Sequence, residues 1–225
     1  NNHPLSVRVL IIFDIDNTLI DFMEFKRISC EAAVDAMKKA GLKMSKKDAL
    51  AVIHRIYRED GYEDPHIFQK FLATTQGEVD YRKLAHAINA YRRARILMPY
   101  PGAKETLKKL KRRGIRLAVV SDAPKMKAWL RLTAIKLDHL FDVVVAHEDT
   151  GKHKPHAIPF QAALKALKVR PEDCLMVGDH PARDIKGAKA LGMKTCLALY
   201  GLQPAFKGPK ADYEISSIPE LLDII

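Results

Sequence analysis

The pattern of apolar and polar positions divides the chain into three parts. A short apolar run at 8–13, rich in β-branched residues, predicts a buried strand because it is too short for a helix. From 24 to about 91, apolar residues recur at helical spacing and predict four amphipathic helices. The pattern changes at 98–102, after which predicted helices and strands alternate. The chain therefore has an α/β part that is interrupted by a helical part.

The helical part has recognisable starts and stops. The first predicted helix covers 24–40 and ends at Gly41, and Ser45 with Asp48 predicts the N-terminal cap of the second. Asp64 followed by Pro65 predicts the start of the third helix, and Asp80 that of the fourth. Because this stretch holds no convincing strand, we interpret 23–96 as an all-helical insertion, and 7–22 with 97–225 as one core domain.

The alternating part predicts a Rossmann-like α/β core with a mostly parallel sheet flanked by helices. Helices of this length between strands are typical of right-handed βαβ units. In such sheets the ligand site lies beyond the carboxyl ends of the strands. The predicted strands after the first are 115–120, 141–145, 174–177 and 195–199, and the predicted helices begin near 103, 124, 157 and 182.

Charge and cysteine content narrow the function. The formal charge is +11, but the densest basic run, 104–116, alternates with Leu107 and Leu110 at helical spacing and predicts a solvated helix face. With no aromatic-rich basic tract, the charge favours small anionic substrates over nucleic acid. The three cysteines form no Cys-x-x-Cys pattern, which is typical of a reduced cytoplasm. No apolar stretch is long enough to cross a membrane, and no secretory signal is visible, so we expect a cytoplasmic protein without a membrane partner.

Polar clusters directly follow four predicted strands. Asp14 and Asp16 come after the first, and two carboxylates so close would repel each other unless a cation lay beside them. Oxygen ligands are those that Mg²⁺ prefers. Ser121 follows the second strand, where a hydroxyl can hold a phosphate oxygen or cap the next helix. Asp179 and Asp184 lie after the strand at 174–177.

The remaining cluster supplies positive charge. Lys152 and Lys154 follow the strand at 141–145, and a lysine there could neutralise phosphate and hold the carboxylates together; the alternative is a solvated basic loop. Both lysines fit this role from their position alone.

In this order, the four clusters resemble the haloacid dehalogenase-like hydrolase superfamily. The most specific pieces are Phe13-Asp-Ile-Asp-Asn-Thr-Leu19 and Val177-Gly-Asp with Asp184 and Gly187 beyond it. The resemblance covers about 8–22 and 97–201, and the helical insertion matches the cap domain that this family places after its first motif. It implies the Rossmann-like fold already predicted, with Mg²⁺ as cofactor.

The resemblance also implies roles for the acidic residues. Asp14 would be the nucleophile that accepts the phosphoryl group, and Asp16 the general acid and base. Asp14, the main-chain carbonyl of Asp16, and Asp179 would hold the metal, and Asp184 would support their carboxylates. These roles suit a loose phosphoryl-transfer transition state, which needs positioning and positive charge.

Three further residues would bind phosphate or shape its site. The resemblance implies that Ser121 and Lys154 bind the transferring phosphoryl group. Lys154 is preferred to Lys152 because it precedes a proline, as the family's lysine usually does. Thr18 is placed with the phosphate-binding residues and would help to fix the turn at Asp16.

The expected function is a magnesium-dependent phosphoric monoester hydrolase that acts on small phosphorylated metabolites through an aspartyl-phosphate. Asp16, two positions after the nucleophile, favours phosphate esters over dehalogenation. Similar small phosphatases act on triose phosphates such as glyceraldehyde 3-phosphate, or on phosphoglycolate. A phosphomutase using the same two aspartates stays open, as does a non-catalytic binder of phosphate or nucleic acid. We expect no nucleic-acid partner and a monomer or homodimer.

Overall fold

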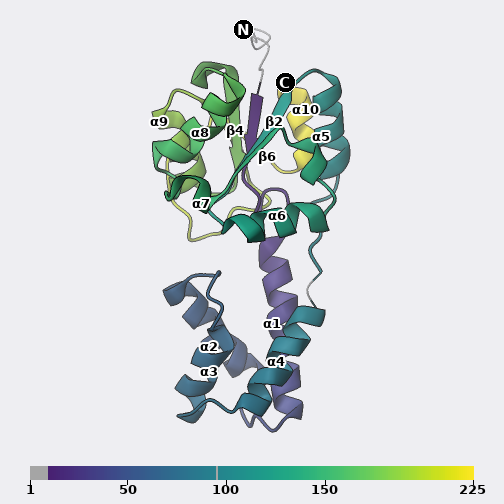
Figure 1. Cartoon of the computed structure of the whole chain (residues 1–225), viewed down its shortest axis with the longest axis vertical. Coiled ribbons are helices and arrows are strands. Elements are labelled where there is room, and N and C mark those ends of the chain that lie inside the picture. Colours follow the sequence, from purple (N-terminus) through teal and green to yellow (C-terminus); the bar gives the residue numbers. More distant parts are fainter. Residues whose placement is uncertain (1–9, 95) are drawn as a thin grey trace. The chain divides into compact units, whose positions relative to one another are not determined.

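The computed structural model describes residues 10–94 and 96–225, so 7–9 of the predicted core domain and the start of the predicted first strand lie outside the described residues. The chain divides into two compact units (Figure 1). One unit is the chain up to Asp21 together with Leu97–Ile225, and the other is Phe22–Ile96. The helical unit thus begins and ends next to the predicted boundaries of the insertion, and its role as a cap stays a prediction.

The core unit is built on a parallel sheet, which confirms the predicted fold class. The six strands have the order β3-β2-β1-β4-β5-β6, so β1 lies between β2 and β4 and the chain winds outward from it in both directions. Leu10 pairs with Arg116 on one side and with Cys174 on the other, which sets the register of the three central strands. The strands are β1 (Leu10–Phe13), β2 (Arg116–Val120), β3 (Val143–Val145), β4 (Cys174–Gly178), β5 (Lys194–Ala198) and β6 (Tyr213–Ile215).

Helices cover both faces of this sheet. Alternate residues of a strand point to opposite faces, and Leu10 and Ile12 pack with Phe160 of α8 and Ala188 of α9. Helices α5 and α10 lie across the sheet from α8 and α9 (Figure 1). The helices are α5 (Ala103–Arg112), α6 (Lys125–Ala134), α7 (His147–Thr150), α8 (Ala157–Leu167), α9 (Lys186–Ala190) and α10 (Leu221–Ile224). Short 3-10 turns cover Asp138–Leu140, Pro171–Asp173 and Ile218–Glu220.

The helical unit has its own hydrophobic core. Its helices are α1 (Phe22–Lys39), α2 (Lys46–Asp60), α3 (Ile67–Gln76) and α4 (Tyr81–Arg93). Ser45 and Asp80 cap α2 and α4 by accepting from backbone N–H groups, as predicted. The third helix begins later than predicted, because Asp64 Oδ1 accepts a hydrogen bond from the backbone N–H of His66 and closes a turn there. The largest fully buried side chains of this core are Tyr57, Phe71, Met37 and Ile53.

Three elements of the core unit differ from the sequence-based expectation. The predicted helix at 182–191 is a π-helical turn, Pro181–Ile185, followed by the short α9. Strand β6 was not predicted, because its three residues include Glu214 and give no apolar run. The predicted strand at 141–145 is shorter, and Asp142 Oδ2 accepts from Leu117 N–H beside its start.

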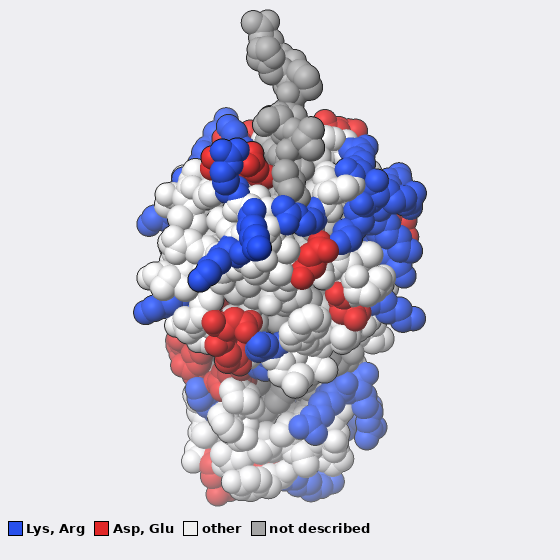
Figure 2. Space-filling view, turned by 45° about the horizontal axis from the view of Figure 1, so that its top comes forward, with Lys and Arg blue, Asp and Glu red and all other residues white. Residues whose placement is uncertain are grey.

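Most of the basic run at 104–116 lies on the solvated face of α5, as predicted, but the helix ends at Arg112 and Arg116 begins strand β2. Lys and Arg side chains gather along one side of the visible surface, on the side where α5 lies (Figure 2). Leu107 and Leu110 of α5 are buried on the opposite side of that helix. Among the described residues, no helix is long and apolar enough to cross a membrane.

Candidate active site

The predicted clusters meet at the carboxyl edge of the parallel sheet. Asp14 directly follows β1, and its backbone N–H donates to Val177 O of β4 at 3.0 Å. Ser121 directly follows β2, and its N–H donates to Val145 O of β3 at 2.9 Å. Asp179 directly follows β4. Because these strands are parallel neighbours, the residues after them share one edge of the sheet.

Three buried carboxylates lie together at this edge. Oxygens of Asp14, Asp179 and Asp184 lie within 4.8 Å of one another. These residues are only 7%, 2% and 1% exposed. The π-helical turn carries Asp184 back toward the strand end, and a Cβ on Gly178 would lie 2.3 Å from Asp184 Oδ2. Only glycine leaves room for this approach.

Lys154 joins the carboxylates. Its Nζ lies 2.7 Å from Asp14 Oδ1 and 2.7 Å from Asp184 Oδ1, and it donates to Val120 O at 2.9 Å. The residue is 3% exposed, whereas Lys152 is exposed to solvent. The backbone N–H of Lys154 donates to Asp122 Oδ1 at 2.8 Å, which fixes the loop that carries the lysine. Of the two candidate lysines, only Lys154 contacts the carboxylates.

Burial and mutual repulsion change the proton affinity of these groups. Burial, together with the charges of Asp14 and Asp184, raises the pKa of Asp179 well above its ordinary value. Burial also raises the pKa of Asp184 to about 6, although Lys154 opposes the change. Burial alone would lower the pKa of Lys154, but the charges of Asp14, Asp184 and Asp122 outweigh it and raise that pKa. The lysine is therefore charged at neutral pH, and the carboxylates still carry an excess of negative charge.

This donor set fits a magnesium ion. Three carboxylates and one ammonium leave two negative charges in excess when all four groups are ionised, and a divalent cation would neutralise them. Carboxylate and carbonyl oxygens are the ligands that Mg²⁺ takes in proteins. Burial is the largest cause of the raised pKa values of Asp179 and Asp184, and repulsion from the neighbouring carboxylates adds to it. Asp14, Asp179 and Asp184 could hold the ion.

The loop after Asp14 turns the Asp16 side chain away from the three buried carboxylates. Asn17 adopts a left-handed conformation with φ of 59°, and its N–H donates to Ile20 O at 2.8 Å, so the backbone turns sharply. The Asp16 side chain points away from the carboxylate cluster and pairs with Arg131 on α6, with 2.6 Å between Asp16 Oδ2 and Arg131 Nη1. A metal contact through the main-chain carbonyl of Asp16, as the resemblance implies, stays a prediction.

The two predicted hydroxyl groups are both buried at the site. Thr18 Oγ1 donates to Asp179 Oδ1 at 3.4 Å, so it orients a candidate metal ligand. Ser121 Oγ accepts from Ala123 N–H at 3.1 Å, which leaves its own hydrogen to donate to a phosphate oxygen. Their predicted roles in phosphate binding stay predictions.

Sequence analysis missed several residues that shape the site. Tyr200 donates its O–H to Thr18 O at 2.8 Å. A Cβ on Gly201 would lie 1.7 Å from Asn17 O, so residues 200–201 brace the loop from outside. Arg131 is buried, while the apolar Met126 on the same helix is 70% exposed. The sequence alone does not show whether a single arginine among the apolar residues of a helix is buried or exposed.

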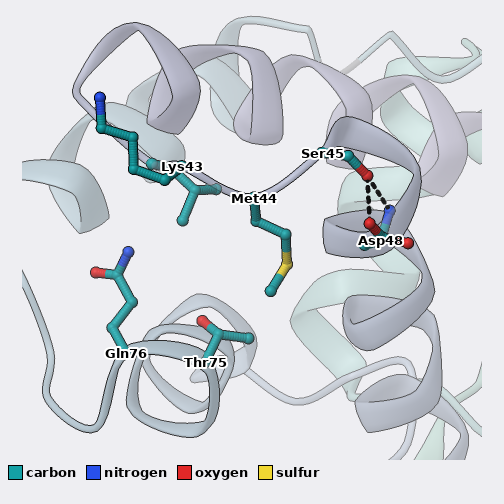
Figure 3. A pocket seen from close by; sticks show the side chains of 7 residues that line it. Lys43, Met44, Ser45, Asp48, Thr75 and Gln76 are labelled. Atoms are coloured by element: carbon teal, nitrogen blue, oxygen red, sulfur yellow. Dashed lines mark hydrogen bonds between the residues drawn. The ribbon is translucent and has the colours of Figure 1, made fainter.

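The helical unit has a separate surface pocket of about 580 Å³. In Figure 3, Met44 and Thr75 point into it, and Ser45 and Asp48 turn toward each other through hydrogen bonds. The Ser45 hydroxyl is used to cap α2. The pocket is lined by Leu42, Lys43, Met44, Ser45, Asp48, Thr75 and Gln76, none of them a predicted site residue.

Comparison with known proteins decides the family. The model of the haloacid dehalogenase-like hydrolases matches residues 11–198. This chain belongs to the haloacid dehalogenase-like hydrolases. It is 33% identical over 218 residues to a glyceraldehyde 3-phosphate phosphatase of Methanocaldococcus jannaschii, a match covering 96% of each chain. It is 32% identical to a pyrophosphatase, PpaX, of Halalkalibacterium halodurans, over 96% of this chain and 95% of the other.

A solved structure extends the comparison to the fold. The crystal structure of a haloacid dehalogenase-like phosphatase from Thermococcus onnurineus superposes with a TM-score of 0.69 and 26% identity, covering 96% of each chain. The predicted family and the predicted enzyme class, a phosphoric monoester hydrolase, are confirmed. Two relatives with different named substrates match this chain equally well, so overall identity does not select the substrate.

Proposed function

We propose that this haloacid dehalogenase-like hydrolase is a magnesium-dependent phosphatase that forms an aspartyl-phosphate on Asp14. The observation that carries the proposal is the setting of Asp14. Its carboxylate lies at the tip of β1, 2.7 Å from the buried ammonium of Lys154 and beside the carboxylates of Asp179 and Asp184. A carboxylate is a weak nucleophile toward a phosphate ester in water, and fixed positive charge at the site lowers the repulsion between the two anions.

The reaction proceeds in two steps. In the first, a carboxylate oxygen of Asp14 forms a bond to phosphorus, the bond to the ester oxygen breaks, and Asp16 gives its proton to the leaving alkoxide. In the second, Asp16 takes a proton from water, whose oxygen attacks phosphorus and breaks the bond to Asp14. Inorganic phosphate leaves, and both aspartates return to their starting states.

The surrounding groups stabilise the transferring phosphoryl group. A bound magnesium ion would supply positive charge to the phosphoryl oxygens and neutralise the carboxylates. Lys154 holds the orientation of Asp14, and Ser121 donates its hydroxyl hydrogen to a phosphoryl oxygen. Thr18 keeps Asp179 oriented through its hydrogen bond.

For the substrate, we propose a small phosphate monoester, with glyceraldehyde 3-phosphate as the first candidate. The named activity of the Methanocaldococcus jannaschii relative supports this choice, and the match runs through both units of the chain. We also propose that Phe22–Ile96 acts as the cap, since it is a compact unit inserted between two parts of the core. A cap predicts good turnover of small esters and poor turnover of phosphoproteins.

A substrate panel tests the proposal. Purified protein is assayed for phosphate release from glyceraldehyde 3-phosphate, phosphoglycolate, pyrophosphate, p-nitrophenyl phosphate and a phosphoprotein, with Mg²⁺ and after chelation by EDTA. We expect glyceraldehyde 3-phosphate to give the highest kcat/KM, chelation to abolish turnover and added Mg²⁺ to restore it. Asp14→Asn is the matched inactive control. Full turnover after exhaustive chelation would overturn the magnesium mechanism, and a phosphoryl transfer that yields an isomeric sugar phosphate would indicate a mutase.

A further inference from the structure

A buried arginine contacts the proposed acid and base. Arg131 Nη1 lies 2.6 Å from Asp16 Oδ2, and the exposed fractions of the Arg131 and Asp16 side chains are 3% and 23%. The distance is short even for a charge-assisted hydrogen bond between an arginine and a carboxylate. The residues are 115 positions apart in sequence, so the fold, and not a local turn, brings them together.

The backbone places both partners firmly. Helix α6 begins at Lys125, directly after the loop that carries Ser121, and its buried side presents Ala128, Arg131 and Leu132 at helical spacing. The backbone of Asp16 is held by a bridge to Ile20. With the backbone fixed on both sides, the main freedom left at Asp16 is rotation of its side chain.

That freedom matters for proton transfer. The terminal torsion of an aspartate is broad, so a carboxylate without a directing contact samples many orientations. A general acid must deliver its proton within hydrogen-bond distance of the leaving oxygen and then collect one from water at the same place. A guanidinium presents donors in a rigid fork, which fixes a carboxylate better than a flexible ammonium does.

We propose that Arg131 is a positioning residue that holds the carboxylate of Asp16 in the orientation needed for both proton transfers. The inference rests on the proposed function, because it takes Asp16 as the acid and base. The alternative is that Arg131 only stabilises the fold, as a buried arginine paired with a carboxylate can.

A double-mutant cycle separates the two roles. The variants are Arg131→Gln, Asp16→Asn and the pair together, assayed with p-nitrophenyl phosphate and Mg²⁺. We expect Arg131→Gln to lower kcat about 10- to 100-fold, the size of effect that a misplaced catalytic group produces, with KM changed less than about threefold. In the Asp16→Asn background the same substitution should have little further effect, since the proton shuttle is already absent. Arg131→Lys should restore part of the loss.

Arg116→Gln is the matched control, because that guanidinium donates to the backbone carbonyl of Leu167 away from the site. Its kcat should stay at the wild-type value. Thermal unfolding of each variant identifies any that fails to fold, and if Arg131→Gln does so, the cycle is run with Arg131→Lys.

Each outcome has a defined meaning. A folded Arg131 variant with wild-type kcat, or a loss that persists undiminished in the Asp16→Asn background, would overturn the positioning role while leaving the proposed function intact. If Asp16→Asn alone kept wild-type kcat, the acid and base assignment would be wrong, and the inference would fall with it.

Discussion

The buried carboxylates make the stabilising effect of magnesium depend on pH. Without metal, the folded protein keeps a proton on Asp184 up to a pKa of about 6, whereas the unfolded chain releases it near the ordinary value of 3.8. The folded state thus binds more protons between these values, and its free energy of unfolding falls as pH rises through that window. Magnesium binds the ionised carboxylates and removes this loss. Its stabilising effect should therefore grow from pH 4 to pH 7.5.

The size of the effect follows from the shift. A change from 3.8 to about 6, at about 1.36 kcal/mol per pKa unit, corresponds to about 3 kcal/mol from Asp184. The raised pKa of Asp179 adds to the effect in the same direction. Because the unfolded chain is already partly ionised at pH 4, only part of this amount falls within the range. We therefore expect the stabilisation by saturating Mg²⁺ to increase by roughly 2 kcal/mol between pH 4 and pH 7.5 from Asp184.

Urea unfolding followed by circular dichroism, at fixed pH with and without Mg²⁺, measures the difference directly. Taking the difference at each pH cancels the titration of groups remote from the site. Asp179→Asn is the control, because it removes one candidate ligand and should reduce the effect of magnesium across the range. A stabilisation that stays constant between pH 5 and pH 7.5, or no stabilisation at any pH, would refute the metal site described here.

Three substitutions test how the site is held together. Lys154→Met should lower the free energy of unfolding in metal-free buffer by about 3–5 kcal/mol, since it leaves buried carboxylates without their cation, and should abolish measurable turnover; a variant with wild-type stability and kcat would contradict this role. Gly201→Ala should lower the melting temperature through a loss of about 1–3 kcal/mol, because the new methyl group would meet Asn17 O at 1.7 Å. Asp122→Ala should lower kcat/KM about tenfold by freeing the loop of Lys154, and an unchanged kcat/KM would show that the tether is dispensable.

The parallel sheet and its polar edge could be predicted from the sequence for a physical reason. Buried parallel strands are continuous apolar runs, and the residues that directly follow them must lie at one edge. Asp14, Ser121 and Asp179 were placed correctly by that rule alone. Position along the chain could not decide whether Lys152 or Lys154 contacts the carboxylates, because this depends on which of the two side chains the loop buries.

Contacts across the fold could not be predicted in the same way. Arg131 contacts Asp16 because it lies on the buried side of α6. Hydrophobic periodicity would instead place apolar residues on that side. Tyr200 reaches Thr18 O over a separation of 182 residues. The third helix was placed too early, since Asp64 closes a turn before the helix starts. The contacts of Arg131 and Tyr200 depend on pairings that no local pattern contains, whereas the turn at Asp64 is a local departure from the expected helix start.

The central claim, a phosphoryl group carried on Asp14, can be tested by trapping it. Asp16→Asn, in which hydrolysis of the intermediate should be slowed, is mixed with p-nitrophenyl phosphate and Mg²⁺, quenched in acid, digested and examined by mass spectrometry. We predict one phosphorylated peptide, labile to hydroxylamine as an acyl phosphate is, with the modification on Asp14 and none in the Asp14→Asn/Asp16→Asn double variant. A phosphoryl group on any other residue, or steady turnover by Asp14→Asn, would contradict the account.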